Sequence, residues 1–351
     1  MSLHTGRGWA ACYLKVGMLR SQDASSAVIE LKQDGSLVVL VGSVEVGAGT
    51  TTVAAQIAAE ELGVDPEMVT VVYGDTETSP YDGGTVGSRS TFIMGNAVRR
   101  AAREVREALF ETAAEEFEVS PDDLVARDGF VRVRGSQDRG MAIGDLSFLT
   151  LYDRRRIVIG RAMFQPETGR VQLTGGRAGF RRDATIMDAE TGQGNPVAAF
   201  SYAAAHAEVE VDDETGLVDV RRFLIATDCG CAINPLLLEG QLEGSTAMGI
   251  DHALREDTRP PTRPDRGITL DLTEYAISTA LDVPEIVTVV VEHPDPNGPF
   301  GAKGAGEINV ILPGPAICNA IFDAVGVRLT ALPATPERVL AGLMAQREEQ
   351  R

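Results

Sequence analysis

The sequence contains little cysteine and little histidine, with four residues of each in a chain of 351. Four cysteines without a Cys-x-x-Cys pair are too few for a disulfide scaffold, and the histidines show no spacing typical of metal ligands. We therefore expect no zinc or iron–sulfur site built from side chains of this chain, and we expect a reducing, cytoplasmic location. The cysteines are Cys12, Cys229, Cys231 and Cys318.

Basic residues and long apolar runs are also scarce. The 32 lysines and arginines stand against 51 aspartates and glutamates, which gives a formal net charge of −19. A charge of that sign argues against general binding to nucleic acids or to anionic membranes. No run of about 18 uncharged apolar residues is present, so the sequence predicts no transmembrane span. The N-terminus lacks the apolar stretch of a secretory signal.

Hydrophobic residues make up 44% of the chain, which is enough for a sizeable core. Their spacing predicts an α+β fold with mixed or antiparallel sheets and packed helices. Two β-hairpins are expected because β-branched runs flank Asp34-Gly35 and Glu214-Thr215-Gly216. Helices are expected where apolar residues recur at helical spacing between capping residues, glycine or proline. The hairpins span 25–43 and 206–228, further strands 69–73 and 286–292, and the helices 51–62, 91–117, 315–326 and 336 onwards.

Two stretches without periodicity are interpreted as connections. Residues 255–267 combine charge with proline and predict an exposed loop. Residues 182–198 predict an irregular connection between a first α+β subdomain, 1–181, and a second, 199–351. Each subdomain is expected to contribute two of the glycine-rich segments described next.

The first two glycine-rich segments each join a turn to the start of a helix. In residues 42–52 (GSVEVGAGTTT), Thr50 is a candidate N-cap, and free N–H groups at a helix start suit an anionic oxygen such as a phosphate. In residues 83–91 (GGTVGSRST), Arg89 offers a guanidinium fork to an anion. Neither segment is a G-x-G-x-x-G fingerprint or a Walker A loop. An ordinary strand-to-helix turn and a flexible capping loop are the alternatives.

The third segment runs from Asp228 through Asn234-Pro235 to EGQLEG at 239–244. The spacing of Cys229 and Cys231 is wrong for a redox or zinc pair, so both are expected to be small buried residues. Gln241 is placed between two glycine-containing turns, where its amide either contacts a ligand or has a structural role.

The fourth segment, residues 298–307 (GPFGAKGAGE), places a carboxylate after four glycines. A backbone of this kind can deliver Glu307 into a narrow site, where burial prepares it to act as a general base. Lys303 is expected to pair with Glu307 or with a ligand phosphate. A surface turn that ends in a solvated glutamate is the alternative.

In this order, the four segments resemble the large molybdenum-cofactor-binding subunit of the xanthine dehydrogenase/aldehyde oxidase family. GSVEVGAGTTT resembles the family's first cofactor loop, GGTVGSRST the second and NP…EGQLEG the third, while GPFGAKGAGE ends in the family's catalytic glutamate. The matching segments extend from near Gly6 to Pro336, and four ordered motifs are far less probable by chance than one. The resemblance implies the C-terminal half of that subunit.

The resemblance implies molybdenum bound through the dithiolene of molybdopterin, with the cytosine dinucleotide form as one option. In this family a glutamate removes a proton from a hydroxyl on the metal, whose oxygen, derived from water, attacks a carbon of an N-heterocycle or an aldehyde. Hydride passes to a sulfido ligand, and electrons leave through iron–sulfur clusters to FAD. Glu307 is thereby implied as the general base. Residues implied to contact the cofactor are Gly47, Ala48, Gly49, Thr50, Gly87, Ser88, Arg89, Gln241 and Lys303.

The sequence departs from the family pattern at two points. The first loop usually reads Gly-Gln-Gly, whereas this chain has Gly47-Ala48-Gly49. The family's subunit is also considerably longer, and its N-terminal part has no counterpart here. We therefore expect this chain to supply one wall of the site and to need a partner chain with the N-terminal half, or to be a fragment of a longer protein. Iron–sulfur and FAD subunits are further expected partners.

Two alternatives come from other classes of function. A non-catalytic molybdopterin carrier or assembly module would bind the cofactor without performing chemistry. A phosphate-binding domain unrelated to molybdenum would use the first two loops alone. The retained Glu307 argues against the carrier, and the lack of lysine at either loop argues against the phosphate-binding domain.

Overall fold

The computed structural model describes residues 2–18, 23–136, 138–166, 172–174, 181–183, 191, 197–257 and 275–349. The expected loop at 255–267 lies outside these residues from 258 onwards, as does most of the expected connection at 182–198. The described residues form an α+β fold with mixed sheets and packed helices, as predicted. The boundary at 182–198 stays a prediction.

The larger sheet has the strand order β1-β11-β12-β13. β11 (Ala199–Asp212) and β12 (Val218–Asp228) form the predicted second hairpin, while β13 (Glu285–Val291) adds in parallel to β12. β1 (Leu3–Val16) pairs antiparallel with β11, from Leu3 opposite Asp212 to Val16 opposite Ala199. The first strand of the chain therefore belongs to a sheet whose other strands all come from the C-terminal part. A simple division of the chain near residue 190 would separate β1 from this sheet.

Four helices accompany this sheet: α4 (Pro235–Leu254), α5 (Ile308–Ile311), α6 (Pro313–Val325) and α7 (Pro336–Glu349). α6 packs closely on β1, because Gly6 and Gly8 carry no side chain there. A Cβ at Gly6 would lie 2.2 Å from the carbonyl oxygen of Ala320, and a Cβ at Gly8 would lie 2.1 Å from that of Ala316. Alternate residues of β11 and β12 and the inner faces of these helices form one hydrophobic core.

The second four-stranded sheet has the order β4-β3-β2-β8. β2 (Ser25–Leu31) and β3 (Leu37–Val41) form the first predicted hairpin, β4 (Val69–Val72) runs parallel to β3, and β8 (Ile159–Phe164) pairs antiparallel with β2. α1 (Thr50–Leu62) and α2 (Gly95–Phe117) pack with this sheet around a second core. One π-helical turn, Ser90–Met94, leads into α2.

The smaller elements lie outside the four glycine-rich segments, except for the 3₁₀ turn Pro299–Gly301, which is part of the fourth. β5 (Leu124–Arg127), β6 (Phe130–Val133) and β7 (Gly140–Ala142) form a three-stranded sheet followed by α3 (Ile143–Phe148). β9 (Gln172–Thr174) and β10 (Arg181–Asp183) pair with each other. Single turns of 3₁₀ or π-helix occupy Pro66–Met68, Pro121–Asp123, Leu149–Asp153 and Pro299–Gly301.

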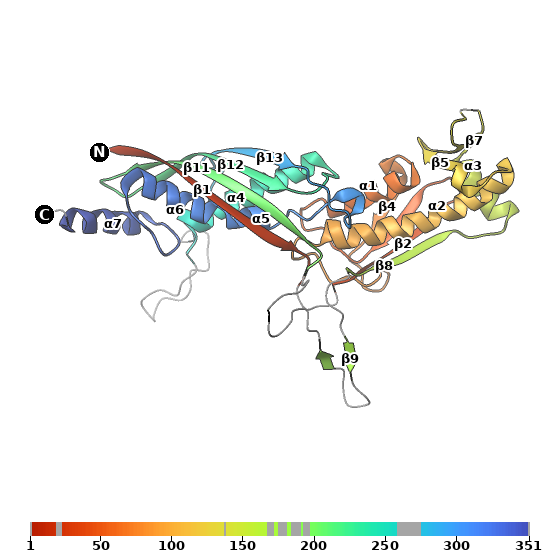
Figure 1. Ribbon diagram of the computed structural model, residues 1–351, viewed down its shortest axis with the longest axis horizontal. Helices are drawn as coiled ribbons and strands as arrows, with labels where there is room; N and C mark the ends of the chain where they lie inside the picture. Colours follow the sequence, from red (N-terminus) through yellow and green to blue (C-terminus); the bar gives the residue numbers. More distant parts are fainter. Residues whose placement is uncertain are drawn as a thin grey trace.

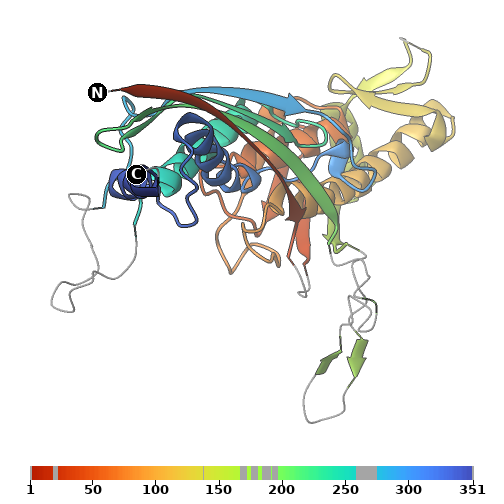
Figure 2. The same cartoon turned by 60° about the vertical axis from the view of Figure 1, so that its left-hand side comes forward.

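The two cores lie side by side along the long axis of the molecule (Figure 1). The start of β1 and the end of α7 lie at the same end, and both views place α1 and α2 toward the opposite end (Figure 2). The 18-residue stretch Ile308–Val325 has a mean hydropathy of 1.5, enough by length and composition to cross a membrane, but half of it is buried in the fold. Its buried residues Ile308, Ala316, Ile317, Ala320 and Ile321 belong to the core beneath β1 and β11.

Candidate active site

A pocket of about 290 Å³ forms where the four glycine-rich segments meet. Ala48 and Thr50 come from the first segment, and residues 85–91 from the second. The third segment contributes Cys229, residues 231–234 and Gln241, and the fourth contributes residues 303–307. Segments up to about 250 residues apart in the sequence thus converge on one cavity, as the resemblance implies.

Glu307 borders this pocket immediately before α5. Its Oε1 accepts a hydrogen bond from the Gly87 N–H at 3.3 Å, and its Oε2 accepts one from the Ser88 hydroxyl at 3.2 Å. The N–H of Glu307 donates in turn to Ser88 Oγ at 3.1 Å. The Glu307 side chain is exposed in this chain, so the expected burial would have to come from another polypeptide segment.

The second and fourth segments touch at Gly304. A Cβ at this position would lie 1.7 Å from the carbonyl oxygen of Ser88, which is too close for any side chain. The carbonyl of Gly304 accepts a hydrogen bond of 2.6 Å from the Ser201 hydroxyl on β11. Glycine at 304 therefore lets the chain that carries Glu307 lie directly against the loop that binds its carboxylate.

Lys303 lies in the wall of the pocket and forms a buried ion pair. Its Nζ is 2.7 Å from Oδ2 of Asp228, at the end of β12. The other oxygen of Asp228 accepts a hydrogen bond from the Gly230 N–H at 3.0 Å. The prediction that Lys303 pairs with Glu307 is therefore wrong, because its ammonium group pairs with Asp228. Contact between Lys303 and a ligand phosphate stays a prediction.

The first segment contains an anion that the sequence interpretation overlooked. Oε1 of Glu45 accepts hydrogen bonds from the N–H groups of Gly47, at 2.7 Å, and Gly49, at 3.0 Å, and Oε2 accepts one from Thr51 at 3.2 Å. Partial burial opposes ionisation of Glu45, but these hydrogen bonds outweigh it and lower its pKa.

The expectation that these N–H groups are free to bind a phosphate is wrong for Gly47 and Gly49, since Glu45 occupies them. Thr50 is the first residue of α1 and not its N-cap, which is Gly49 in a left-handed conformation. Ala48 and Thr50 still line the pocket, so the first segment keeps a place at the site. A carboxylate two residues before Gly47 was the signal in the sequence for this arrangement.

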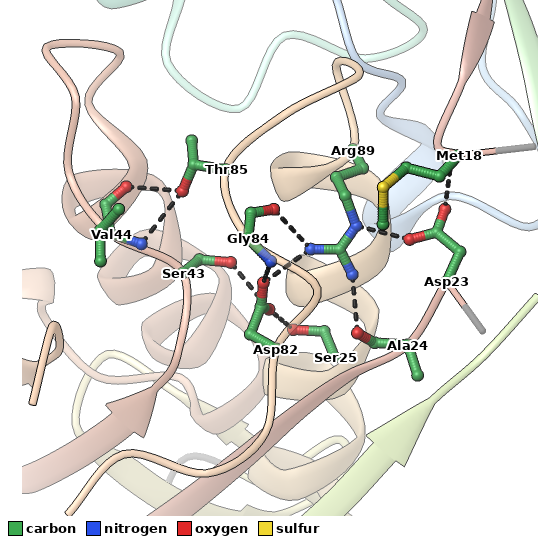
Figure 3. A network of polar contacts seen from close by, with 10 residues as sticks. All are labelled: Met18, Asp23, Ala24, Ser25, Ser43, Val44, Asp82, Gly84, Thr85 and Arg89. Atoms are coloured by element: carbon green, nitrogen blue, oxygen red, sulfur yellow. Dashed lines mark hydrogen bonds and ion pairs between the residues drawn. The ribbon is translucent and has the colours of Figure 1, made fainter. Parts of the chain in front are cut away.

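Arg89 is fully buried, and its guanidinium is bound by two carboxylates and two backbone carbonyls (Figure 3). Nε donates to Asp23 Oδ1 at 2.5 Å and Nη1 to Asp82 Oδ1 at 2.7 Å, which gives two buried ion pairs. The carbonyls of Gly84 and Ala24 accept from Nη1 at 2.8 Å and from Nη2 at 2.7 Å. The prediction that the Arg89 fork binds the cofactor is wrong, because the protein itself satisfies the fork.

Gln241 lies inside helix α4 and not between turns, which corrects the sequence interpretation of residues 239–244. Its Nε2 donates to the carbonyl of Gly47 at 3.3 Å, so it connects the third segment to the first at the pocket. Asn234 caps the helix by accepting a 3.0 Å hydrogen bond from the Leu237 N–H, and Pro235 occupies the first turn. This Asn-Pro start was a usable helix signal.

Cys229 and Cys231 line the pocket as free thiols. Burial, together with the carboxylates of Glu292 and Asp228, raises the pKa of the Cys229 thiol to about 11. Burial raises the pKa of Cys231 as well, with a further contribution from Glu292. Cys229 is buried, as predicted, and Cys231 is half-buried. Among the described residues, no group of three or more His, Cys, Asp or Glu could hold a metal ion.

The pocket's donor groups fit a polar organic cofactor. Thr50, Ser90, Thr91, Asn234 and Gln241 offer hydroxyl and amide groups around the cavity. There is also space for a ligand beside the two loops, since a Cβ at Gly47 or at Gly84 would meet no heavy atom within 4 Å. The cations at the pocket wall, Arg89 and Lys303, are neutralised by aspartates. The rest of the lining combines these neutral donors with apolar side chains such as Val86, Ile233 and Leu237.

A pocket lined by neutral donors and apolar side chains, with one carboxylate held at its edge, is suited to binding an organic cofactor. The chain belongs to the molybdopterin cofactor-binding domain family, whose sequence signature matches residues 2–284. This membership replaces the alternative of a phosphate-binding domain unrelated to molybdenum.

Two curated relatives and one solved structure show the same relationship. The chain is 35% identical to the 6-hydroxypseudooxynicotine dehydrogenase complex subunit gamma of Paenarthrobacter nicotinovorans, over 89% of this chain and 37% of the relative. It is 34% identical to the probable hypoxanthine oxidase XdhD of Escherichia coli K12, over 97% of this chain and 32% of the relative. The crystal structure of quinoline 2-oxidoreductase from Pseudomonas putida 86 superposes with a TM-score of 0.84 at 26% identity, over 97% of this chain and 42% of that chain. The chain thus spans roughly a third to two-fifths of the length of these proteins.

Proposed function

We propose that this chain forms the Glu307-bearing wall of the active site in a molybdenum-dependent hydroxylase. The observation that carries the proposal is the position of the Glu307 carboxylate at the edge of a cofactor-sized pocket, held by Gly87 and Ser88. The reaction class is oxidative hydroxylation of an N-heterocycle or an aldehyde, with water as the oxygen source. Relatives named for heterocycle and aldehyde oxidation support this class.

In the proposed reaction, the chain's own residues bind the cofactor and move one proton. The cofactor, when bound, supplies the two-electron redox chemistry. Gln241, Ala48 and Thr50 border one side of the cavity and Ser90 and Thr91 another, where they would contact it. Glu307 accepts the proton of the nucleophilic oxygen at its carboxylate, and the two hydrogen bonds fix the direction in which that carboxylate points.

The finer parts of the proposal concern the rest of the enzyme. We propose that a polypeptide carrying the portion of the relatives that this chain lacks closes the pocket and buries Glu307. FAD and iron–sulfur clusters on partner chains or domains would carry electrons away, and the cofactor would be molybdopterin, in its simple or its cytosine dinucleotide form. Relatives named as subunits of complexes support such an assembly. A cytoplasmic location belongs to the same proposal.

The test is Glu307→Gln in the assembled enzyme, purified with its natural partner polypeptides. Glutamine keeps the size and the hydrogen-bonding oxygen of the side chain but cannot accept the proton. We expect turnover to fall by about 10²–10⁴-fold, while molybdenum and pterin content stay at the wild-type level. Molybdenum binding without any turnover in the wild-type assembly would instead support a non-catalytic carrier or assembly module. Unchanged turnover in the variant would overturn the assignment of the base.

A further inference from the structure

The loop at 82–91 is fixed to the rest of the fold at several points (Figure 3). Asp82 holds its start, because Oδ2 accepts hydrogen bonds from the hydroxyls of Ser25 on β2 and Ser43 after β3. Thr85 holds its middle, since its hydroxyl and the backbone of Val44 exchange hydrogen bonds of 2.7 and 3.0 Å. These contacts attach the loop to the edge of one sheet.

Arg89 joins the two ends of this loop to a separate segment of the chain. One guanidinium bridges Asp82 and Gly84 at the start of the loop and Asp23 and Ala24 before β2. Asp23 in turn accepts a 2.8 Å hydrogen bond from the Met18 N–H just after β1. We call the set Asp23, Asp82 and Arg89 the arginine clamp. All three side chains are nearly or fully inaccessible to solvent.

The residue next to the clamp has an unfavourable backbone conformation. Ser88 has a φ of +52°, in the left-handed region that residues with a side chain rarely adopt. Such a conformation is strained relative to the usual regions, so surrounding contacts must enforce it. The contacts adjoining Ser88 include the clamp at Arg89, the 2.9 Å hydrogen bond from the Gly17 N–H to the Gly87 carbonyl, and the close approach of Gly304 to the Ser88 carbonyl.

The enforced conformation aims two donors at the same carboxylate. With φ positive at Ser88, the Gly87 N–H and the Ser88 hydroxyl both reach Glu307, and Ser88 Oγ also accepts the Glu307 N–H. A different φ at Ser88 would change the direction of its hydroxyl relative to the Gly87 N–H, so both donors could not keep these positions. The chain of contacts therefore runs from the buried guanidinium through Ser88 to the candidate base.

We propose that Arg89 is a positioning residue for Glu307, which acts through Ser88 and Gly87 and never touches substrate or cofactor. The arginine clamp keeps the left-handed turn closed, and the turn keeps the carboxylate pointing into the pocket. This assignment rests on the proposed function for the role of Glu307 in turnover. Its structural part, the control of the turn by the clamp, stands on the contacts of this chain.

The first experiment compares Arg89→Lys with Arg106→Lys in the assembled enzyme. Lysine keeps the charge but has one ammonium group, which cannot bridge two carboxylates and two carbonyls. Arg106 is a matched control because it forms an ion pair of 2.7 Å with the buried Glu61 in the same core, away from the loop. For Arg89→Lys we expect kcat to fall by about ten- to a hundredfold with KM and molybdenum content unchanged. For Arg106→Lys we expect wild-type kcat.

Hydrogen–deuterium exchange supplies a readout that does not depend on turnover. In Arg89→Lys, amides of residues 83–91 and of Glu307 should exchange at least about tenfold faster, while the amides of α1 and α6 keep their protection. A uniform increase across the whole chain would mean that Arg89 supports only global stability and would overturn the proposal. Unchanged exchange in the loop would overturn it as well.

A double-mutant cycle tests whether Arg89 acts through Ser88. Ser88→Ala removes the hydroxyl that connects the turn to Glu307. If Arg89 works through this hydroxyl, Arg89→Lys should lower kcat much less in the Ser88→Ala background than in the wild type. Full additivity of the two losses would contradict the proposed route.

Asp23→Asn provides a milder change if Arg89→Lys does not fold. It keeps the shape of the clamp, removes one charge, and should give a smaller change of the same kind in kcat and loop exchange.

The exchange data also separate this proposal from the proposed function. If Glu307→Gln leaves turnover unchanged but the loop loosens in Arg89→Lys, the proposed base is wrong while the clamp's control of the turn holds. If Glu307→Gln abolishes turnover but Arg89→Lys and Asp23→Asn keep wild-type loop exchange and wild-type kcat, the clamp proposal is wrong and the proposed function stands.

Discussion

Ser88 and Glu307 exchange hydrogen bonds in both directions: the Ser88 hydroxyl donates to the Glu307 carboxylate at 3.2 Å, and the Glu307 N–H donates back to Ser88 Oγ at 3.1 Å. The pair joins two segments separated by 219 residues. It fixes both the side chain and the backbone of the candidate base. Activity should therefore depend on this half-buried hydroxyl.

Ser88→Ala and Ser88→Gly separate the hydroxyl from the backbone conformation. Both variants lose the donor to Glu307, so kcat should fall in both by a similar factor of about ten. Glycine adopts the positive φ without cost, so Ser88→Gly should be more stable than Ser88→Ala by about 1 kcal/mol. Steady-state kinetics and urea unfolding measure the two effects. A wild-type kcat in Ser88→Gly would show that the hydroxyl does not contribute.

Much of the architecture could be predicted from local patterns, because hairpins and amphipathic helices depend on near neighbours. Asp34-Gly35 and the turn at Gly216 marked both hairpins correctly. Helix α4 was missed since Gly240 and Gly244 resemble turn residues, although both lie on an open face where glycine only weakens a helix. β1 was missed because its pairing partner, β11, begins about 180 residues later, beyond the reach of any local pattern.

In the site, too, the sequence motifs were recognised, but the partners of the charged residues were not. The four segments and Glu307 were found because their glycines and order are visible in the sequence. The charged residues were assigned wrongly, because the sequence does not tell which partner neutralises a charge. Asp23 lies 66 residues from Arg89, and Asp228 lies 75 residues from Lys303. Asp23, Asp82 and Glu45 were overlooked since isolated acidic residues are usually solvated surface groups.

Glu45→Gln should make the first loop's contribution to stability insensitive to pH. The pKa of Glu45 is lowered from its ordinary value of 4.5 by the N–H groups of its own loop, despite some burial. A carboxyl with a lowered folded-state pKa adds stability above its unfolded pKa, and that stability is lost as the pH falls through the folded value.

The stability difference between wild type and Glu45→Gln should therefore be largest at neutral pH and should shrink below the ordinary glutamate pKa. Because Glu45 is partly exposed, solvent screening keeps the expected difference at about 1 kcal/mol. Urea unfolding at a series of pH values measures it. A difference that grows as the solution is acidified would contradict this account.

Lys303→Met tests the buried ion pair at the pocket wall. In the wild type, Lys303 Nζ lies 2.7 Å from Asp228 Oδ2. Removing the ammonium leaves the Asp228 carboxylate buried without its partner, so the variant should lose about 3–5 kcal/mol of stability. The double variant Lys303→Met, Asp228→Asn should recover most of this loss, because neither charge is then left unpaired. If the single variant is as stable as the wild type, the ion pair has no structural role.

Gly304→Ala should disrupt the junction between the two segments that form the site. The added methyl would lie 1.7 Å from the Ser88 carbonyl oxygen and 2.7 Å from its carbon, so the backbone at 304 or at 88 must move. We expect a loss of stability of at least about 2 kcal/mol. We also expect a large loss of kcat, since the movement separates Glu307 from Ser88. Gly240→Ala is the matched control, because a Cβ there meets no heavy atom within 4 Å and lies inside a helix. It should stabilise the purified chain by roughly 0.5–1 kcal/mol in urea unfolding. Equal stability for the two variants would show that the segments do not meet at Gly304 as described.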